Sequence, residues 1–300
     1  MIELLIEMWS FAFMQRAIVA TTVLSASVAP VGTFLVLRRL SLAGEAMAHA
    51  ITPGVVIGFV VAGLSVFSLL IGGVIAGGVA AVLTALLARK TILRSDASLA
   101  SIYLIALAAG IFILSAAGSA VPLKSFLFGS ILGIDDASMI LIGAVATVTL
   151  VAFAFLLRPL IISTCDPVFF EAQTKRPLLV EQAFMLLLVL NLIAAFKTLG
   201  TLMAVGLMIL PATTARYWSS TITGQLGLTF VFALSSCWVG LTLSYFFPET
   251  PSGPAIVLTA GGFFLVSVLL GPHGFGVRLR KTTPQSTSSI VQTPTEKSPQ

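Results

Sequence analysis

Long apolar runs alternate with short polar stretches along almost the whole chain. A helix rises about 1.5 Å per residue and the hydrocarbon core of a bilayer is about 30 Å thick, so a spanning helix needs about 20 apolar residues. Nine runs approach or exceed that length: 13–37, 42–64, 66–88, 99–117, 137–157, 178–196, 199–218, 226–247 and 254–270. The pattern predicts an all-α, polytopic membrane helix bundle with eight or nine transmembrane helices.

Composition supports this class: 58% of the residues are apolar, only 9% are charged, and the mean hydropathy is +1.09. A soluble domain carries about 25% charged residues. The apolar stretch 121–133 is too short to span and is expected to be a re-entrant or interfacial segment, covered by protein. Residues 277–300 are rich in Ser, Thr, Pro and Gln, which predicts a disordered cytoplasmic tail after one transmembrane domain over residues 1–276.

The basic residues predict the orientation of the chain. Three of the sixteen Lys and Arg residues, Arg16, Lys124 and Lys197, fall on one side of the predicted bundle. The other thirteen fall on the opposite side, which the positive-inside rule makes cytoplasmic. Nine spans then place the N-terminus outside and the C-terminus inside. The basic residues flank the membrane spans, where they are expected to contact lipid. They form no stripe interleaved with aromatic residues, so the net charge of +5 does not indicate nucleic-acid binding.

The sequence offers few residues that could carry out enzymatic chemistry. It contains no GxxxxGK[ST] phosphate loop, no G-x-S-x-G, no H-E-x-x-H and no CxxC, and it has only two histidines. Cys165 is expected in a loop and Cys237 inside a span, so no disulfide is predicted. We therefore expect no catalytic residues and no permanently bound cofactor.

One motif places ionisable side chains inside an apolar run. The stretch SLAGEAMAHAITPG carries Glu45 and His49, which are four residues apart and share one helix face. His49 follows Arg39 by ten residues, roughly 15 Å along a helix, so it is expected near the middle of the bilayer. Pro53 and Gly54 follow directly, which predicts a kink or break just past the pair.

Three interpretations of this pair are open. A buried Glu–His hydrogen bond could only hold two helices together, whereas the functional alternatives are a proton relay and a cation site. One chain offers just two ligands, and Zn²⁺ takes about four. Two copies at a two-fold axis would supply two carboxylates and two imidazoles, a ligand set suited to Zn²⁺ or Mn²⁺.

The longest cytoplasmic loop contains a second distinctive stretch, DPVFFEAQ. Asp166 and Pro167 form a typical N-cap and first helical position, and Phe169 and Phe170 are expected to expose their rings. Such a short helix either docks into a groove of a soluble partner or lies on the lipid headgroups. The sequence supports both alternatives.

Four stretches together resemble one family over about residues 13–276. SLAGEAMAHAITPG, STCDPVFFEAQ, LGTLMAVGLMILPATTARYW and the closing SGPAIVL with FFLVSVLLGPHG are similar, in the same order, to motifs of the membrane permeases of bacterial zinc/manganese/iron ABC importers. The resemblance implies a homodimeric permease in the bacterial plasma (inner) membrane. It also implies two copies of a cytoplasmic ATPase subunit and an extracytoplasmic metal-binding protein as partners.

Carried over residue by residue, the resemblance gives Glu45 and His49 the positions of metal ligands in the translocation path. It assigns contact with the ATPase subunit to one segment, namely Asp166, Pro167, Phe169, Phe170, Glu171, Ala172 and Gln173. Two features depart from the family pattern. Glu45 replaces the commoner Asp, which bears on the preferred metal. The segment continues as TKRP without the usual glycine, which bears on how it docks.

The resulting prediction is a permease subunit of an ATP-driven importer of divalent transition metals, zinc or manganese and also iron, with ATP hydrolysis on a separate chain. The alternative is a proton-coupled secondary transporter in which Glu45 and His49 relay protons and no ATPase takes part.

Overall fold

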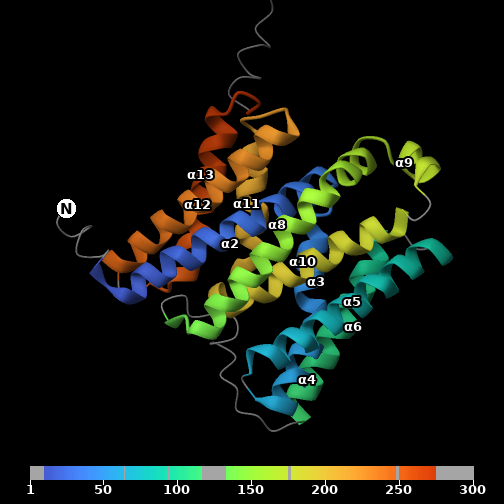
Figure 1. The fold of residues 1–300 in the computed structure, drawn as a ribbon, viewed down its shortest axis with the longest axis horizontal. Helices are drawn as coiled ribbons and strands as arrows, with labels where there is room; N and C mark the ends of the chain where they lie inside the picture. Colours follow the sequence, from blue (N-terminus) through green and yellow to red (C-terminus); the bar gives the residue numbers. More distant parts are fainter. Residues whose placement is uncertain are drawn as a thin grey trace, which may run out of the picture.

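The computed structural model describes residues 10–63, 65–92, 95–116, 133–174, 177–247 and 250–274, which form helices and no strand (Figure 1). The expected tail over residues 277–300 and the short segment 121–133, apart from Gly133, lie outside the described residues. The helices in chain order are α2 (Ala12–Leu37), α3 (Ser41–Ala50), α4 (Thr52–Ala62), α5 (Val66–Lys90), α6 (Ser95–Ala116), α8 (Asp136–Cys165), α9 (Pro167–Gln173), α10 (Pro177–Leu199), α11 (Thr201–Arg216), α12 (Ile222–Phe246) and α13 (Ser252–Leu270).

Eight segments of the described residues are long and apolar enough to cross a membrane, with α3 and α4 counted together as one span. This confirms the all-α membrane bundle. The expectation of a full-length span over residues 199–218 is wrong, because α11 has only 16 residues and reaches about 24 Å. Gly200, with φ +84°, separates it from α10. Packing against α2, α12 and α13 surrounds this short helix with protein.

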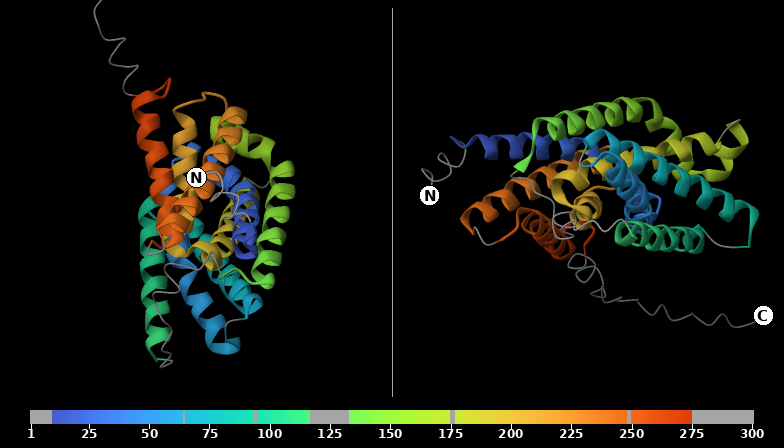
Figure 2. Two further views of the ribbon diagram at one scale, coloured as in Figure 1. Left: turned by 90° about the vertical axis from the view of Figure 1, so that its left-hand side faces the viewer. Right: turned by 90° about the horizontal axis from the view of Figure 1, so that it is seen from below.

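The helices form two groups joined by a central layer (Figure 1). Helices α3 to α6 pack mainly on one another at one end, and α11 to α13 pack together at the other. Between them lie α2, α8 and α10, as the two further views also show (Figure 2). The span of α2 is 72% buried, whereas that of α6 is 17% buried, so α2 belongs to the protein core and α6 to the periphery.

Helices α2 and α8 run side by side in the same direction, with polar contacts at both ends. Near their N-termini, Arg16 forms an ion pair with Asp136 at 3.1 Å between exposed side chains. Directly after α2, Arg38 donates hydrogen bonds to the hydroxyls of Ser163 and Thr164 in the last turn of α8, the second at 3.2 Å. The two helices are thereby held in one register along their length.

Helices α4 and α5 approach so closely that their backbones touch. A Cβ atom on Gly54 would overlap the carbonyl oxygen of Gly72, and its distance from the Cβ of Ala76 would be 2.6 Å. Small residues permit this approach between membrane helices, where close packing replaces the hydrophobic driving force of water. This contact lies just after the break between α3 and α4, so it holds the first turn of α4 against α5.

We expect Gly54→Ala to destabilise the folded protein by about 1–3 kcal/mol, because the added methyl group overpacks the contact between α4 and α5. Gly78→Ala is the matched control, since a Cβ at Gly78 meets nothing within 4 Å. The control should leave stability unchanged or raise it by up to about 1 kcal/mol through helix propensity. Thermal unfolding of the two purified variants in detergent measures the difference, and equal melting temperatures would contradict the prediction.

Candidate functional site

The second apolar run folds as two helices, α3 and α4, that meet at Ile51. Pro53 explains the break, because it has no N–H to donate to the carbonyl of His49, four residues earlier, and its ring crowds that carbonyl. Gly110 of α6 packs against the same place, since a Cβ there would lie 3.1 Å from the nitrogen of Pro53. The predicted break just past the Glu–His pair is confirmed.

Glu45 and His49 lie on the outer face of α3. Leu42 shares this face because the three residues are spaced by three and four positions. Leu42 is 77% exposed, Glu45 is exposed and His49 is partly buried. The positions from Ala43 to Ala50 other than Glu45 and His49 are alanine, Gly44 and Met47, and all are buried against the rest of the subunit. A single chain therefore presents its carboxylate and imidazole on a surface.

The interpretation that Glu45 and His49 form a buried hydrogen bond that only holds two helices together does not fit this geometry. Glu45 is exposed, and in the described part of the chain neither side chain forms a hydrogen bond or an ion pair. Nor do the described residues contain any group of three or more His, Cys, Asp and Glu side chains that could hold a metal ion. Each chain brings two donors to this face, too few to enclose a metal alone.

Tyr103 of α6 is a neighbour of His49 that the sequence analysis missed. The two rings lie 6.1 Å apart between centroids, at an angle of 33°. Helix α6 packs along α3, which brings its aromatic side chain to the imidazole. The only signal in the sequence is that Tyr103 is one of just three tyrosines and interrupts an aliphatic run.

The stretch DPVFFEAQ forms the short helix α9 as predicted. The Asp166 carboxylate caps it by accepting a hydrogen bond from the Phe169 N–H at 2.9 Å, and Pro167 occupies the first turn. Phe169 is 49% exposed, as expected, but Phe170 is 7% exposed, so the expectation of two exposed rings is wrong for Phe170. In a helix adjacent side chains point about 100° apart, so the Phe170 ring faces the bundle while the Phe169 ring stays outside.

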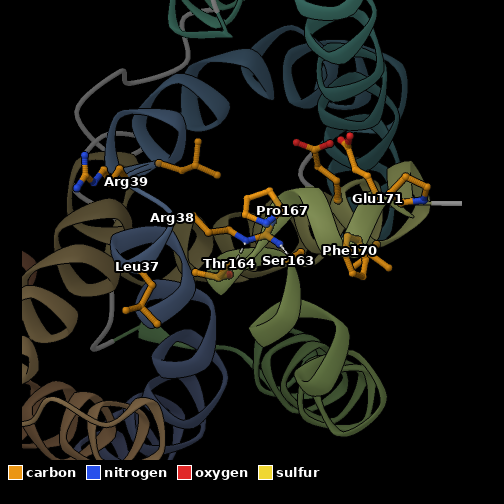
Figure 3. Close-up of a pocket in the computed structure, with 12 residues that line it drawn as sticks. Leu37, Arg38, Arg39, Ser163, Thr164, Pro167, Phe170 and Glu171 are labelled. Atoms are coloured by element: carbon orange, nitrogen blue, oxygen red, sulfur yellow. Dashed lines mark hydrogen bonds between the residues drawn. The ribbon is translucent and has the colours of Figure 1, made fainter. Parts of the chain in front are cut away.

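A cavity of about 440 Å³ separates α9 from the end of α2 (Figure 3). Its lining includes Arg38, Ser163, Thr164, Phe170, Glu171 and Glu181. Partial burial lowers the pKa of the Arg38 guanidinium from its ordinary value, and the negative charge of Glu181 acts in the opposite direction. Arginine keeps its charge in proteins, so this corner of the cavity is positive.

Both cysteines are free. Cys165 is the last residue of α8 and is exposed, where a loop was expected, while Cys237 is buried inside α12 as expected. The Cys237 sulfur lies 3.6 Å from the Ser25 hydroxyl, which links α12 to α2.

Comparison with known proteins identifies relatives over nearly the whole chain. The model of the ABC 3 transport family matches residues 10–271. The chain is 30% identical to the manganese import system permease protein ScaB of Streptococcus parasanguinis, over 87% of this chain and 92% of that protein. It is also 30% identical to the zinc transport system membrane protein TroC of Treponema pallidum, over 90% of this chain and 92% of that protein.

Two solved structures share the fold. The structure described as PsaBC from Streptococcus pneumoniae in complex with Fab superimposes with a TM-score of 0.82 at 30% identity, covering 93% of this chain and all of that one. An inward-facing putative metal-chelate type ABC transporter superimposes with a TM-score of 0.64 at 16% identity, over 87% of each chain. The second likeness concerns the fold alone.

We expect Asp166→Ala to loosen α9, because it removes the side-chain acceptor that caps the helix, an interaction worth about 1 kcal/mol. Hydrogen exchange of the α9 amides should become about fivefold faster. Asp166→Asn is the matched control, since its amide oxygen keeps the capping acceptor. Equal exchange in the alanine and asparagine variants would contradict a capping role for this side chain.

Proposed function

The chain belongs to the ABC 3 transport family, and we propose that it lines the path of an ATP-driven importer for a divalent transition metal. It is a membrane-spanning permease subunit and a multi-pass protein of the plasma membrane. Relatives named for manganese and for zinc transport support the substrate class. The observation that carries the proposal is the outward-facing pair of Glu45 and His49 on the first half of a broken membrane-spanning segment.

The metal site is shared between two copies of the chain. One subunit brings one carboxylate and one imidazole to the outer face of α3, and a second subunit across a two-fold axis doubles the set. Two oxygen and two nitrogen donors suit Zn²⁺ and Mn²⁺, and Fe²⁺ as well. The exposure of Leu42 and Glu45 in the single chain supports this arrangement, because a second subunit would cover that face.

A transported ion must be held and then released, which a site between two subunits permits. When the two α3 helices separate, the four donors separate with them and the ion loses its enclosure. The Glu45 side chain is one methylene longer than the Asp common in the family, so its carboxylate reaches further toward a shared ion. The Tyr103 ring of the same subunit lies beside the His49 imidazole.

Helix α9 is the docking segment for a cytoplasmic ATPase subunit, one on each permease copy. Val168 is 80% exposed and Phe169 is 49% exposed, so the helix offers an apolar surface on the side of the bundle that carries most of the arginines. Apolar side chains on a short helix fit a groove of a soluble partner. Glu171, Ala172 and Gln173 are exposed beside them, while Phe170 anchors the helix to the bundle. An extracytoplasmic metal-binding protein delivers the ion on the opposite side.

We expect His49→Ala and Glu45→Gln each to lower metal uptake at least about tenfold, because loss of groups around a metal site costs that much in affinity or activity. Uptake of Mn²⁺ and Zn²⁺ by proteoliposomes that contain the complete transporter measures the effect. His273→Ala is the matched control, since this other histidine is exposed after α13 and its contact to the Tyr217 carbonyl uses only the backbone N–H.

The same proteoliposomes separate ATP-driven import from proton coupling. Import should require both ATP and the ATPase subunit, and a pH gradient without them should move no metal. Metal uptake by the permease alone in response to a pH gradient would overturn the proposal in favour of a proton relay. Full uptake by His49→Ala would remove this residue from the path.

A shared site makes a distinct prediction for a tandem fusion of two permease copies. His49→Ala in only one half should abolish most uptake, because every ion needs donors from both halves. Two independent sites would instead leave about half of the activity, since one intact copy is half of the pair. The fusion with two unaltered halves serves as the control.

A further inference from the structure

The connection from α2 to α3 is short and tightly hydrogen-bonded. Arg38, Arg39 and Leu40 form it, with the Leu40 N–H donating to the Leu35 carbonyl at 2.8 Å and the Arg39 N–H to the Val36 carbonyl at 3.1 Å. Arg39 has φ +58°, a left-handed conformation that turns the chain sharply. Because α3 begins at Ser41, three residues after Arg38, and carries Glu45 in its second turn, displacement of this connection moves the helix that bears the carboxylate.

The Arg38 side chain reaches across to the end of α8. Its guanidinium donates hydrogen bonds to the hydroxyls of Ser163 and Thr164. Both hydroxyls donate in turn to the Leu160 carbonyl, at 3.0 and 2.6 Å, so their lone pairs are left to accept from the arginine. Asp166, the cap of α9, follows Thr164 by two residues. The Arg38 side chain thus connects the N-terminal end of α9 with the N-terminal end of α3.

The guanidinium is also held from a third side. Its central carbon lies 5.3 Å from the centre of the Phe184 ring of α10, a buried side chain. Stacking on an aromatic face suits the planar guanidinium. An arginine that only marks the membrane interface would extend into water, as its neighbour Arg39 does by being exposed. Arg38 is instead partly buried and bonded to named partners.

A cavity beside Arg38 separates α9 from the connection between α2 and α3. Pro167, Phe170 and Glu171 of α9 line one side, and the connection from α2 to α3 lines the other (Figure 3). The space of about 440 Å³ between these two sides is not filled by side chains. The hydrogen bonds of Arg38 cross the edge of this space.

We propose that Arg38 is the positioning residue that transmits movement of α9 to α3, and so couples ATP hydrolysis to the opening and closing of the metal site. This inference rests on the proposed function, in which α9 docks the ATPase and Glu45 and His49 hold the ion. Arg38 touches neither the ATPase-facing surface nor the metal. It acts by holding the ends of α2 and α8 together.

The test is the number of ATP molecules hydrolysed per metal ion imported, measured in proteoliposomes that contain the complete transporter and Mn²⁺ or Zn²⁺. Arg38→Met should keep ATP hydrolysis but raise this ratio about fivefold or more, the usual size of a coupling between sites. The double variant Ser163→Ala with Thr164→Val keeps the arginine, removes its acceptors and should raise the ratio likewise. Arg38→Lys should also raise it, because one ammonium cannot reproduce the planar, forked contact.

Arg158→Met is the matched control, since it removes an exposed arginine from the same end of α8 and should leave the ratio unchanged. Wild-type ratios in the Arg38→Met and Ser163/Thr164 variants would overturn the inference. So would a parallel fall of hydrolysis and import, which indicates lost docking, or rescue by lysine, which indicates a role for charge alone. If Arg38→Met does not fold, the Ser163/Thr164 variant decides. Absence of ATP-driven import by the unaltered transporter would refute the proposed function itself.

Discussion

The cost of placing an ionisable side chain in hydrocarbon governs this protein. A charged residue at the centre of a spanning helix costs about 3 kcal/mol or more, so such residues are rare and lie where something offsets the cost. Here the charged residues, 9% of the chain, lie mostly at the ends of apolar runs, and Glu45 with His49 is the exception. Their own subunit does not enclose them. The proposed second copy and the metal ion supply what the single chain lacks.

The surrounding fold positions this pair by backbone geometry. Small residues let α3 pack tightly on its inner side, and Pro53, four residues after His49, causes the break that ends α3 at Ala50. The contact of Gly54 with Gly72 then holds α4 against α5. At the other end of α3, the connection at Arg38 and Arg39 joins it to the most buried span. The site is thus held at one end by the contact of α4 with α5 and at the other by the connection to α2, the most buried of the described spans.

Sequence reasoning succeeded where the chemistry is local. The cap and first turn of α9 follow from Asp166 and Pro167, and the break after His49 follows from the missing N–H of Pro53, so both were predictable. It failed where packing decides. Phe169 and Phe170 are identical neighbours in sequence, yet one is exposed and the other buried. The run 199–218 is mostly apolar, but Gly200 and the protein around α11 leave only a short helix.

The sequence by itself determined the membrane class and the presence of an acid and an imidazole on one face of a helix, and it predicted on which side of the membrane the basic residues lie. These follow from hydropathy, charge and helical period, which are properties of neighbouring residues. Only the tertiary structure decided that this face is open, that Tyr103 lies against His49 and that Arg38 bridges to Ser163 and Thr164. Those contacts join residues far apart in the chain, and their formation depends on how the helices pack, which no local pattern specifies.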